Sequence, residues 1–154
     1  MRENKALLTD RLAVAFLLAL TVATACGPAT DPVQQTIDGI VEGAEDRETA
    51  AIVERLSPDF QAADGSGRAD AEATLRRYLG AYEKLGVRIS DLTIERAAGA
   101  ARARFRADLT GSPRRIGGLE GLLPQASAYR FDIRLVPAEG GRWLVTWASW
   151  EPAS

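Results

Sequence analysis

Histidine is absent from this chain of 154 residues, and cysteine and methionine occur once each. Zinc sites and nucleophile–base pairs are usually built from histidine and cysteine, so both kinds of site lack their ordinary groups here. A glycine-rich phosphate-binding loop is missing as well. We therefore expect no metal site, no cofactor and no histidine-based catalytic triad.

An excess of basic charge is also missing. The chain has 19 lysine and arginine residues against 21 acidic ones, a formal net charge of −2. Because nucleic acid is bound by a concentrated positive face, we expect no nucleic-acid partner. The hydrophobic content of 46% is ordinary for a single globular domain, and the chain is long enough to bury a core without disulfides.

The apolar run near the N terminus is too short to cross a membrane. Residues 12–25 form fourteen uncharged positions, whereas a spanning helix needs about 20. Three basic residues precede this run, and small residues end it at Cys26. A positive flank, a short apolar run and a small-residue end are typical of a secretory signal peptide, which we predict for residues 1–25.

The residues before Cys26, Ala23-Thr24-Ala25, resemble the lipobox of bacterial lipoproteins, although that family favours leucine where Ala23 stands. The resemblance implies that Cys26 is acylated, with palmitate among its lipids, and becomes the first residue of the mature chain. Residues 26–31 would then be a lipidated tether, and the domain would lie outside the cytoplasm on the periplasmic side of the bacterial cell envelope. An ordinary secreted protein and a short membrane anchor are the alternatives.

Residues 32–85 carry apolar side chains at helical spacing in three groups. Asp31 and Pro32 predict the start of the first helix, Asp46 caps the second and Asp70 caps the third. Pro58 would stop the second helix, and Gly86 the third. The apolar positions are Val33, Ile37, Ile40, Val41 and Ala44, then Ala50, Val53 and Leu56, and finally Leu75, Tyr78, Leu79, Tyr82 and Leu85.

From residue 87 the period changes to two. Residues 87–95, 101–109 and 129–135 are predicted strands, and residues 142–150 form the last strand after a Gly140-Gly141 hairpin turn. Helices followed by alternating strands indicate an α+β fold, with three N-terminal helices gathered on one face of an antiparallel sheet.

Residues 32–152 resemble the nuclear transport factor 2-like superfamily. The resemblance depends on the order of elements and on three segments: LSPDF at 56–60, RRYLGAYEKLG at 76–86 and GGRWLVTWASWEP at 140–152. It implies a cone, in which a curved antiparallel sheet wraps three N-terminal helices around a pocket. It does not imply one activity, because this fold carries enzymes, binding modules and docking domains alike.

The helix-facing side of the sheet combines small and aromatic residues. Small side chains on a strand that packs against helices leave room, and aromatic rings around that room would make an apolar cavity with a few polar groups. The alternative is that the rings fill the core. The ligand-binding candidates are Tyr78, Tyr82, Ala101, Ala103, Phe105, Tyr129, Phe131, Trp143 and Trp147.

Carboxylates are the remaining groups for acid–base chemistry. Relatives resembling ketosteroid isomerase and polyketide cyclases use an Asp or Glu in an apolar pocket, where burial raises its pKa. Asp59 is the weak catalytic candidate here, and Asp132 is a weaker one. Asp59 could instead bind backbone N–H groups in a turn, and Asp132 could form a cross-strand ion pair.

The opposite face of the sheet should carry an arginine stripe. It could meet anionic lipid head groups or an acidic partner, or it could be a solvated face neutralised by Glu95, Asp108 and Asp132. Residues 111–127 could form a lid, a second membrane contact or a loop packed on its own domain. The stripe consists of Arg102, Arg104, Arg106, Arg130 and Arg134.

Together these features predict a membrane-anchored, non-enzymatic, extracytoplasmic module that binds a small apolar or amphipathic ligand in the cone. The anchor would be the lipid on Cys26. The first alternative is a protein-interaction or envelope-assembly module with an envelope protein as partner. The second is a carboxylate-dependent isomerase, cyclase or dehydratase.

Overall fold

The computed structural model describes residues 30–113 and 128–153. The predictions for residues 1–29, including Cys26, and for residues 114–127 lie outside this part. The helices are α1 (Pro32–Glu45), α2 (Thr49–Val53) and α3 (Arg68–Gly80). The strands are β1 (Leu56–Ala62), β2 (Tyr82–Ala97), β3 (Ala100–Pro113), β4 (Ala128–Pro137) and β5 (Trp143–Pro152), with a 3-10 turn at Glu139–Gly141 before the last.

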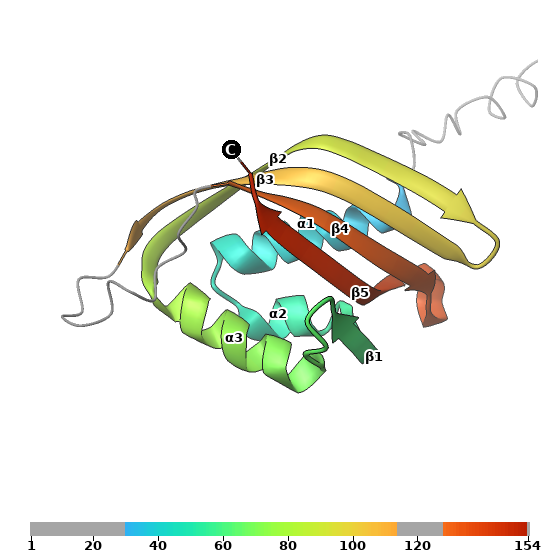
Figure 1. Cartoon of the computed structure of the whole chain (residues 1–154), viewed down its shortest axis with the longest axis horizontal. Coiled ribbons are helices and arrows are strands. Elements are labelled where there is room, and N and C mark those ends of the chain that lie inside the picture. Colours follow the sequence, from blue (N-terminus) through green and yellow to red (C-terminus); the bar gives the residue numbers. More distant parts are fainter. Residues whose placement is uncertain (1–29, 114–127, 154) are drawn as a thin grey trace, which may run out of the picture.

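The five strands form one curved sheet in the order β1-β5-β4-β3-β2, and the helices lie against its concave side (Figure 1). Every neighbouring pair is antiparallel except β1 with β5, which is parallel. The predicted α+β class is therefore confirmed, whereas the sheet is antiparallel-rich and not wholly antiparallel as predicted. The three helices do not follow one another directly, because β1 lies between α2 and α3.

The segment 56–60, expected to end the second helix and turn, is the edge strand β1 instead. Leu56 pairs with Val145, whose N–H donates to the Arg55 carbonyl. Pro58 is compatible with this strand because an edge strand leaves one side without a ladder partner. Sheet pairing across about ninety residues thus overrides the local stop signal.

The start of α1 is as predicted. The Asp31 carboxylate accepts a hydrogen bond from the Val33 N–H at 2.8 Å, and Pro32 occupies the first helical position. The predicted cap of α3 is displaced by one turn: Gly67 is the N-cap, and Asp70 in the first turn accepts the Gly67 N–H at 3.1 Å.

The helix α3 ends at Gly80, earlier than its apolar stripe predicts. Tyr82 and Leu85 belong to β2, where they pair with Pro113 and Gly111 of β3. Gly86 is therefore a strand residue and not a helix stop. The Gly140-Gly141 hairpin is confirmed, since both glycines have positive φ, 72° and 74°.

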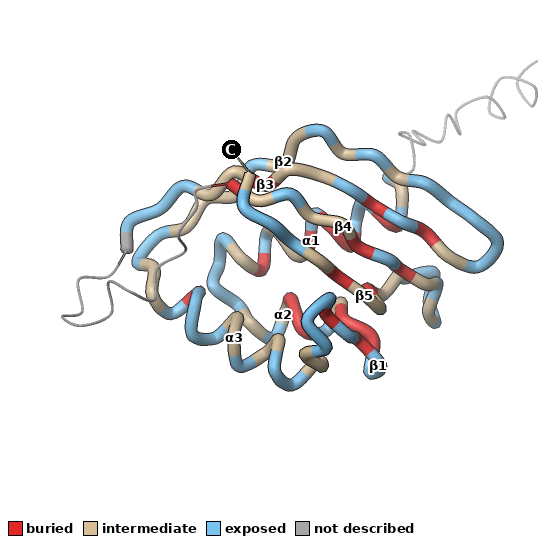
Figure 2. Tube along the Cα trace, viewed as in Figure 1, coloured by how far each residue is buried: buried red, intermediate tan, exposed pale blue. Residues whose placement is uncertain are grey.

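The core lies between α1 and one half of the sheet. Val33 and Ile37 of α1 are fully buried, and the Thr36 hydroxyl donates to the Trp143 carbonyl at 2.8 Å. Figure 2 shows buried positions along the central strands and β1. The buried cluster comprises Val33, Ile37, Leu56, Phe60, Ala62, Ala101, Ala103, Ile133, Leu135, Val145 and Ala148.

Candidate functional site

A bulge in β5 decides which tryptophan faces the helices. Leu135 of β4 pairs with Val145, but Arg134 pairs with Trp147, so Thr146 is an extra residue. An extra residue reverses the face of every side chain beyond it. Trp147 therefore lies on the outer face, where the Arg134 guanidinium stacks 4.6 Å from its ring centre. The prediction that Trp147 lines the cone is wrong, and Trp150 takes the inner position.

Four aromatic rings lie together on the concave face. Phe105 and Phe131 stack with centroids 5.2 Å apart and planes 14° from parallel. Tyr129 and Trp150 each lie 6.4 Å from Phe131, in tilted arrangements. Offset and tilted contacts at these distances are the favourable geometries of aromatic pairs.

Two further tyrosines extend this group toward α3. Burial raises the pKa of the Tyr82 phenol, and repulsion from ionised Tyr129 and Tyr78 raises it further. Tyr82 therefore stays a protonated hydrogen-bond donor at neutral pH. We call the six residues the aromatic mouth: Tyr78, Tyr82, Phe105, Tyr129, Phe131 and Trp150.

The aromatic mouth is not sealed in the core. Trp150 is 48% exposed and Tyr78 is 42% exposed, and the other four side chains are half-buried. Large apolar side chains gathered on one face and left open to solvent are typical of an interaction site. The mouth thus has the composition of a ligand site: rings for contact area and phenols for polar contacts.

The other predicted lining residues lie at the packed half of the sheet. Ala101 and Ala103 are 4% and 0% exposed, within the core cluster that includes Val33 and Ile37 of α1. Trp143 packs against the same cluster. The room left by the two alanines is therefore occupied by the helix, so core filling describes this half of the sheet, and the ligand cavity stays a prediction.

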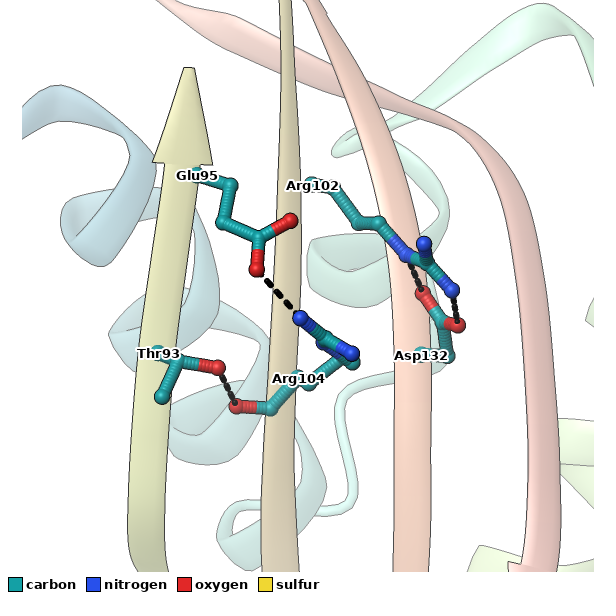
Figure 3. Close-up of polar contacts among 5 residues, drawn as sticks. All are labelled: Thr93, Glu95, Arg102, Arg104 and Asp132. Atoms are coloured by element: carbon teal, nitrogen blue, oxygen red, sulfur yellow. Dashed lines mark hydrogen bonds and ion pairs between the residues drawn. The ribbon is translucent and has the colours of Figure 1, made fainter.

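The arginine stripe lies on the outer face, as predicted. The Arg102 guanidinium binds both oxygens of Asp132, with Nε to Oδ1 at 2.8 Å, Arg104 pairs with Glu95, and Arg106 pairs with Asp108 at 3.0 Å. Figure 3 shows the first two pairs, with the helices behind the sheet. The Arg102 hydrogen bond holds the pKa of Asp132 below its usual value. Three of the five arginines are thus neutralised within the sheet.

A hollow of about 450 Å³ is lined by charged residues of the outer face together with Phe105, Phe131 and Trp150 of the mouth. Beside it, Asp91 has a φ of 55°, which a non-glycine residue rarely adopts, at a bulge where Asp91 and Leu92 oppose one residue of β3. Charges of both signs line the hollow in equal number, so it has no net attraction for one sign. The charged lining residues are Asp91, Arg104, Arg106, Arg130, Asp132 and Glu151.

Neither predicted carboxylate reaches the aromatic mouth. Asp132 is on the outer face with Arg102. Asp59 is exposed on β1, and its N–H donates to the Ser57 hydroxyl at 3.3 Å. Within residues 30–113 and 128–153 no group of three potential ligands is placed to hold a metal ion. No helix in the same residues is long and apolar enough to cross a membrane.

No protein-family model and no curated protein matches this chain. Several solved structures, in contrast, are similar to it in fold. A candidate scytalone dehydratase from Novosphingobium aromaticivorans superposes with a TM-score of 0.64 at 10% identity, over 80% of this chain and 83% of that one. A nuclear transport factor 2-like protein from Cytophaga hutchinsonii gives 0.59 at 13% identity, over 79% and 95%.

A candidate dehydratase of the nuclear transport factor 2-like family from Streptomyces avermitilis gives a TM-score of 0.63 at 9% identity, over 80% of this chain and 94% of that one. The fold is nuclear transport factor 2-like. At these identities the likeness concerns the fold alone. The aromatic mouth of this nuclear transport factor 2-like domain is therefore characterised by its own residues.

Two features of the site escaped prediction from the sequence. Trp150 was missed because the face of β5 residues depends on the bulge at Thr146, and residues 143–148 do not alternate clearly enough to reveal an extra residue. The bulge at Asp91 does leave a signal, because two consecutive polar residues, Ser90 and Asp91, shift the alternation between Ile89 and Leu92. In both cases the pairing with the neighbouring strand determines where the extra residue lies.

Proposed function

We propose that this chain is a non-enzymatic binding module that holds a small apolar or amphipathic molecule at the aromatic mouth. The observation that carries the proposal is the exposure of Trp150 beside the stacked Phe105–Phe131 pair, with Tyr78 of α3 also exposed. Burying these rings against an apolar ligand would be favourable, and the tyrosine hydroxyls would bind its polar groups.

The location belongs to the same proposal. The signal peptide at residues 1–25 and the lipobox before Cys26 support a lipid-anchored protein on the periplasmic side of the bacterial cell envelope. Such an anchor would keep the binding domain beside a membrane, with residues 26–31 as its tether.

The two alternatives have less support. A dehydratase, as two of the similar structures are described, or an isomerase would need an acid or base at the mouth. The six mouth residues include no carboxylate, and Asp59 is exposed on β1. A docking role for the outer face is weakened because Arg102, Arg104 and Arg106 are already paired with carboxylates of the same sheet.

Two tryptophan variants test the ligand site. The lipid-anchored protein is purified from its membrane, and organic extracts are examined by mass spectrometry for a compound that accompanies it. Trp150→Ala should lower the amount of compound per protein about tenfold, because a stacking contact is worth roughly 1–3 kcal/mol. Trp147→Ala, on the outer face, is the matched control and should retain the wild-type amount.

The proposal fails if the wild-type protein carries no compound, or if the two variants lose it equally. Circular dichroism of both variants establishes that each is folded. The mass of the N-terminal peptide gives the lipid state of Cys26 independently of the ligand.

A further inference from the structure

The chain enters the domain at the end farthest from the aromatic mouth. Asp31, one residue after the described chain begins, forms an ion pair with Arg96 at the end of β2. The helix α1 therefore starts beside the β2–β3 hairpin (Figure 1), and the Thr36 bond to Trp143 places the start of β5 there too. We call residues 96–102 and 134–142, the two hairpin tips, the hairpin end.

The aromatic mouth lies at the other end of the same strands. Tyr82 begins β2 and Trp150 is near the end of β5. Tyr82 is fourteen positions from Arg96 along β2, about 45 Å at the usual rise of a strand, and Phe105 in the middle of the sheet is three positions, about 10 Å, from Arg102. The Glu45 carboxylate at the far end of α1 accepts the Val87 N–H at 2.9 Å, so the helix runs from the hairpin end toward the mouth.

The tether is much shorter than the distance from the hairpin end to Tyr82 at the far end of the mouth. Four residues lead from Cys26 to Thr30, and a fully extended chain of that length spans at most about 14 Å. A lipid on Cys26 would therefore hold the hairpin end against the bilayer surface.

The charge of the hairpin end suits an anionic surface. It contains four arginines and Glu139, and two of the arginines, Arg96 and Arg102, are paired with the neighbouring carboxylates Asp31 and Asp132. The other two arginines are exposed and contact no carboxylate within the described residues: Arg134 stacks on Trp147, and the Arg142 side chain donates to the Glu139 carbonyl. Arginines near a bilayer with anionic phospholipids are attracted to its head groups.

We propose that the hairpin end is a docking surface for anionic phospholipid head groups, and that the aromatic mouth opens away from the membrane. This inference rests on the proposed lipid anchor at Cys26. Its consequence is that the mouth exchanges its ligand with the space beyond the bilayer surface, and not directly with the membrane that holds the protein.

Two single-cysteine variants test the orientation in the lipidated full chain. Because the sulfur of Cys26 carries the lipid, an introduced cysteine is the only free thiol. Ala98→Cys labels the β2–β3 tip, and Ser112→Cys labels the mouth end of β3; both positions are exposed. Each is coupled to a bimane fluorophore in vesicles of phosphatidylethanolamine and phosphatidylglycerol that contain a phospholipid with a spin label on its head group.

Quenching should be at least about threefold stronger at position 98 than at position 112. The double variant R134Q/R142Q should bring this ratio toward one, since each arginine near an anionic surface contributes about fivefold to binding. R77Q/R88Q removes two exposed arginines outside the hairpin end and should leave the ratio unchanged.

Equal quenching at the two positions, or stronger quenching at position 112, overturns the orientation while the anchor stands. If the purified full chain carries no lipid on Cys26 and does not float with vesicles, both the anchor and the orientation are overturned. A ratio that responds equally to the two double variants overturns the role of the hairpin-end arginines.

Discussion

The bidentate Arg102–Asp132 pair gives the outer face a pH-dependent contribution to stability. Because this pairing lowers the Asp132 pKa below 3.8 in the folded state, the ionised form is favoured by folding. The contribution is therefore fully present above the unfolded pKa and is lost as pH falls through the folded value.

Replacing Asp132 with Asn should thus lower the free energy of unfolding by about 0.5–1 kcal/mol at pH 7, the range for partly exposed ion pairs. At pH values well below 3.8 the difference from wild type should shrink toward zero as Asp132 becomes protonated in the folded protein too. Urea unfolding at both pH values measures it. Asp59→Asn makes the same chemical change at an exposed carboxylate without an ion pair in the described structure, and should cost less at pH 7.

Glycine 111 allows β2 and β3 to approach closely at the mouth. A Cβ atom there would lie 2.5 Å from the Lys84 carbonyl oxygen, a backbone atom that cannot move aside alone. Gly111→Ala should therefore destabilise the protein by about 1–3 kcal/mol, the usual cost of overpacking.

Gly80→Ala is the matched control, because a Cβ at the end of α3 meets nothing within 4 Å and Gly80 does not have a positive φ. That substitution should be neutral or stabilising by up to about 1 kcal/mol. Thermal and urea unfolding compare the two variants. Equal stability of both would contradict the close approach at Gly111.

Elements governed by local signals were predictable, and those governed by pairing were not. The start of α1 combines a cap at Asp31, proline at the next position and an apolar stripe, and the structure agrees. At 76–86 the spacing favours a helix throughout, yet pairing with β3 makes a strand from Tyr82 onward. Leu56 is likewise in a strand because it pairs with β5.

The same distinction applies to the candidate site. Alternation placed Phe105, Tyr129 and Phe131 on the helix-facing side correctly, because β3 and β4 pair without a shift of register. Alternation failed for Trp147, because one extra residue in β5 reverses the faces that follow. The position of the helix above the sheet, which fills the space beside Ala101 and Ala103, has no counterpart in the strand pattern.

At the scale of the molecule, the two halves of the sheet differ in how far their side chains are buried. Toward the hairpin end, α1 covers the rows that contain Ala103 and Leu135, and both side chains are fully buried. Toward the mouth, the rings of Tyr78 and Trp150 remain exposed. Packing is thus complete toward the hairpin end, whereas the mouth combines exposed rings with buried Ala107 and Ala128.

Local opening should follow this division. Amides of buried, well-packed rows exchange with solvent only in large unfolding events, whereas thinly covered segments open more easily. We expect the amides of Ala103 and Leu135 to exchange at least about a hundredfold more slowly than those of residues 84–87 and 109–112. Hydrogen exchange followed by mass spectrometry of peptides measures this directly.

The compound extracted with the protein, when it is added back, should slow exchange at the mouth and leave the hairpin end unchanged, because binding protects only the segments that it orders. Uniform protection along β2 and β3 without ligand would mean that the mouth is as tightly packed as the core, and would remove the physical basis for ligand entry there.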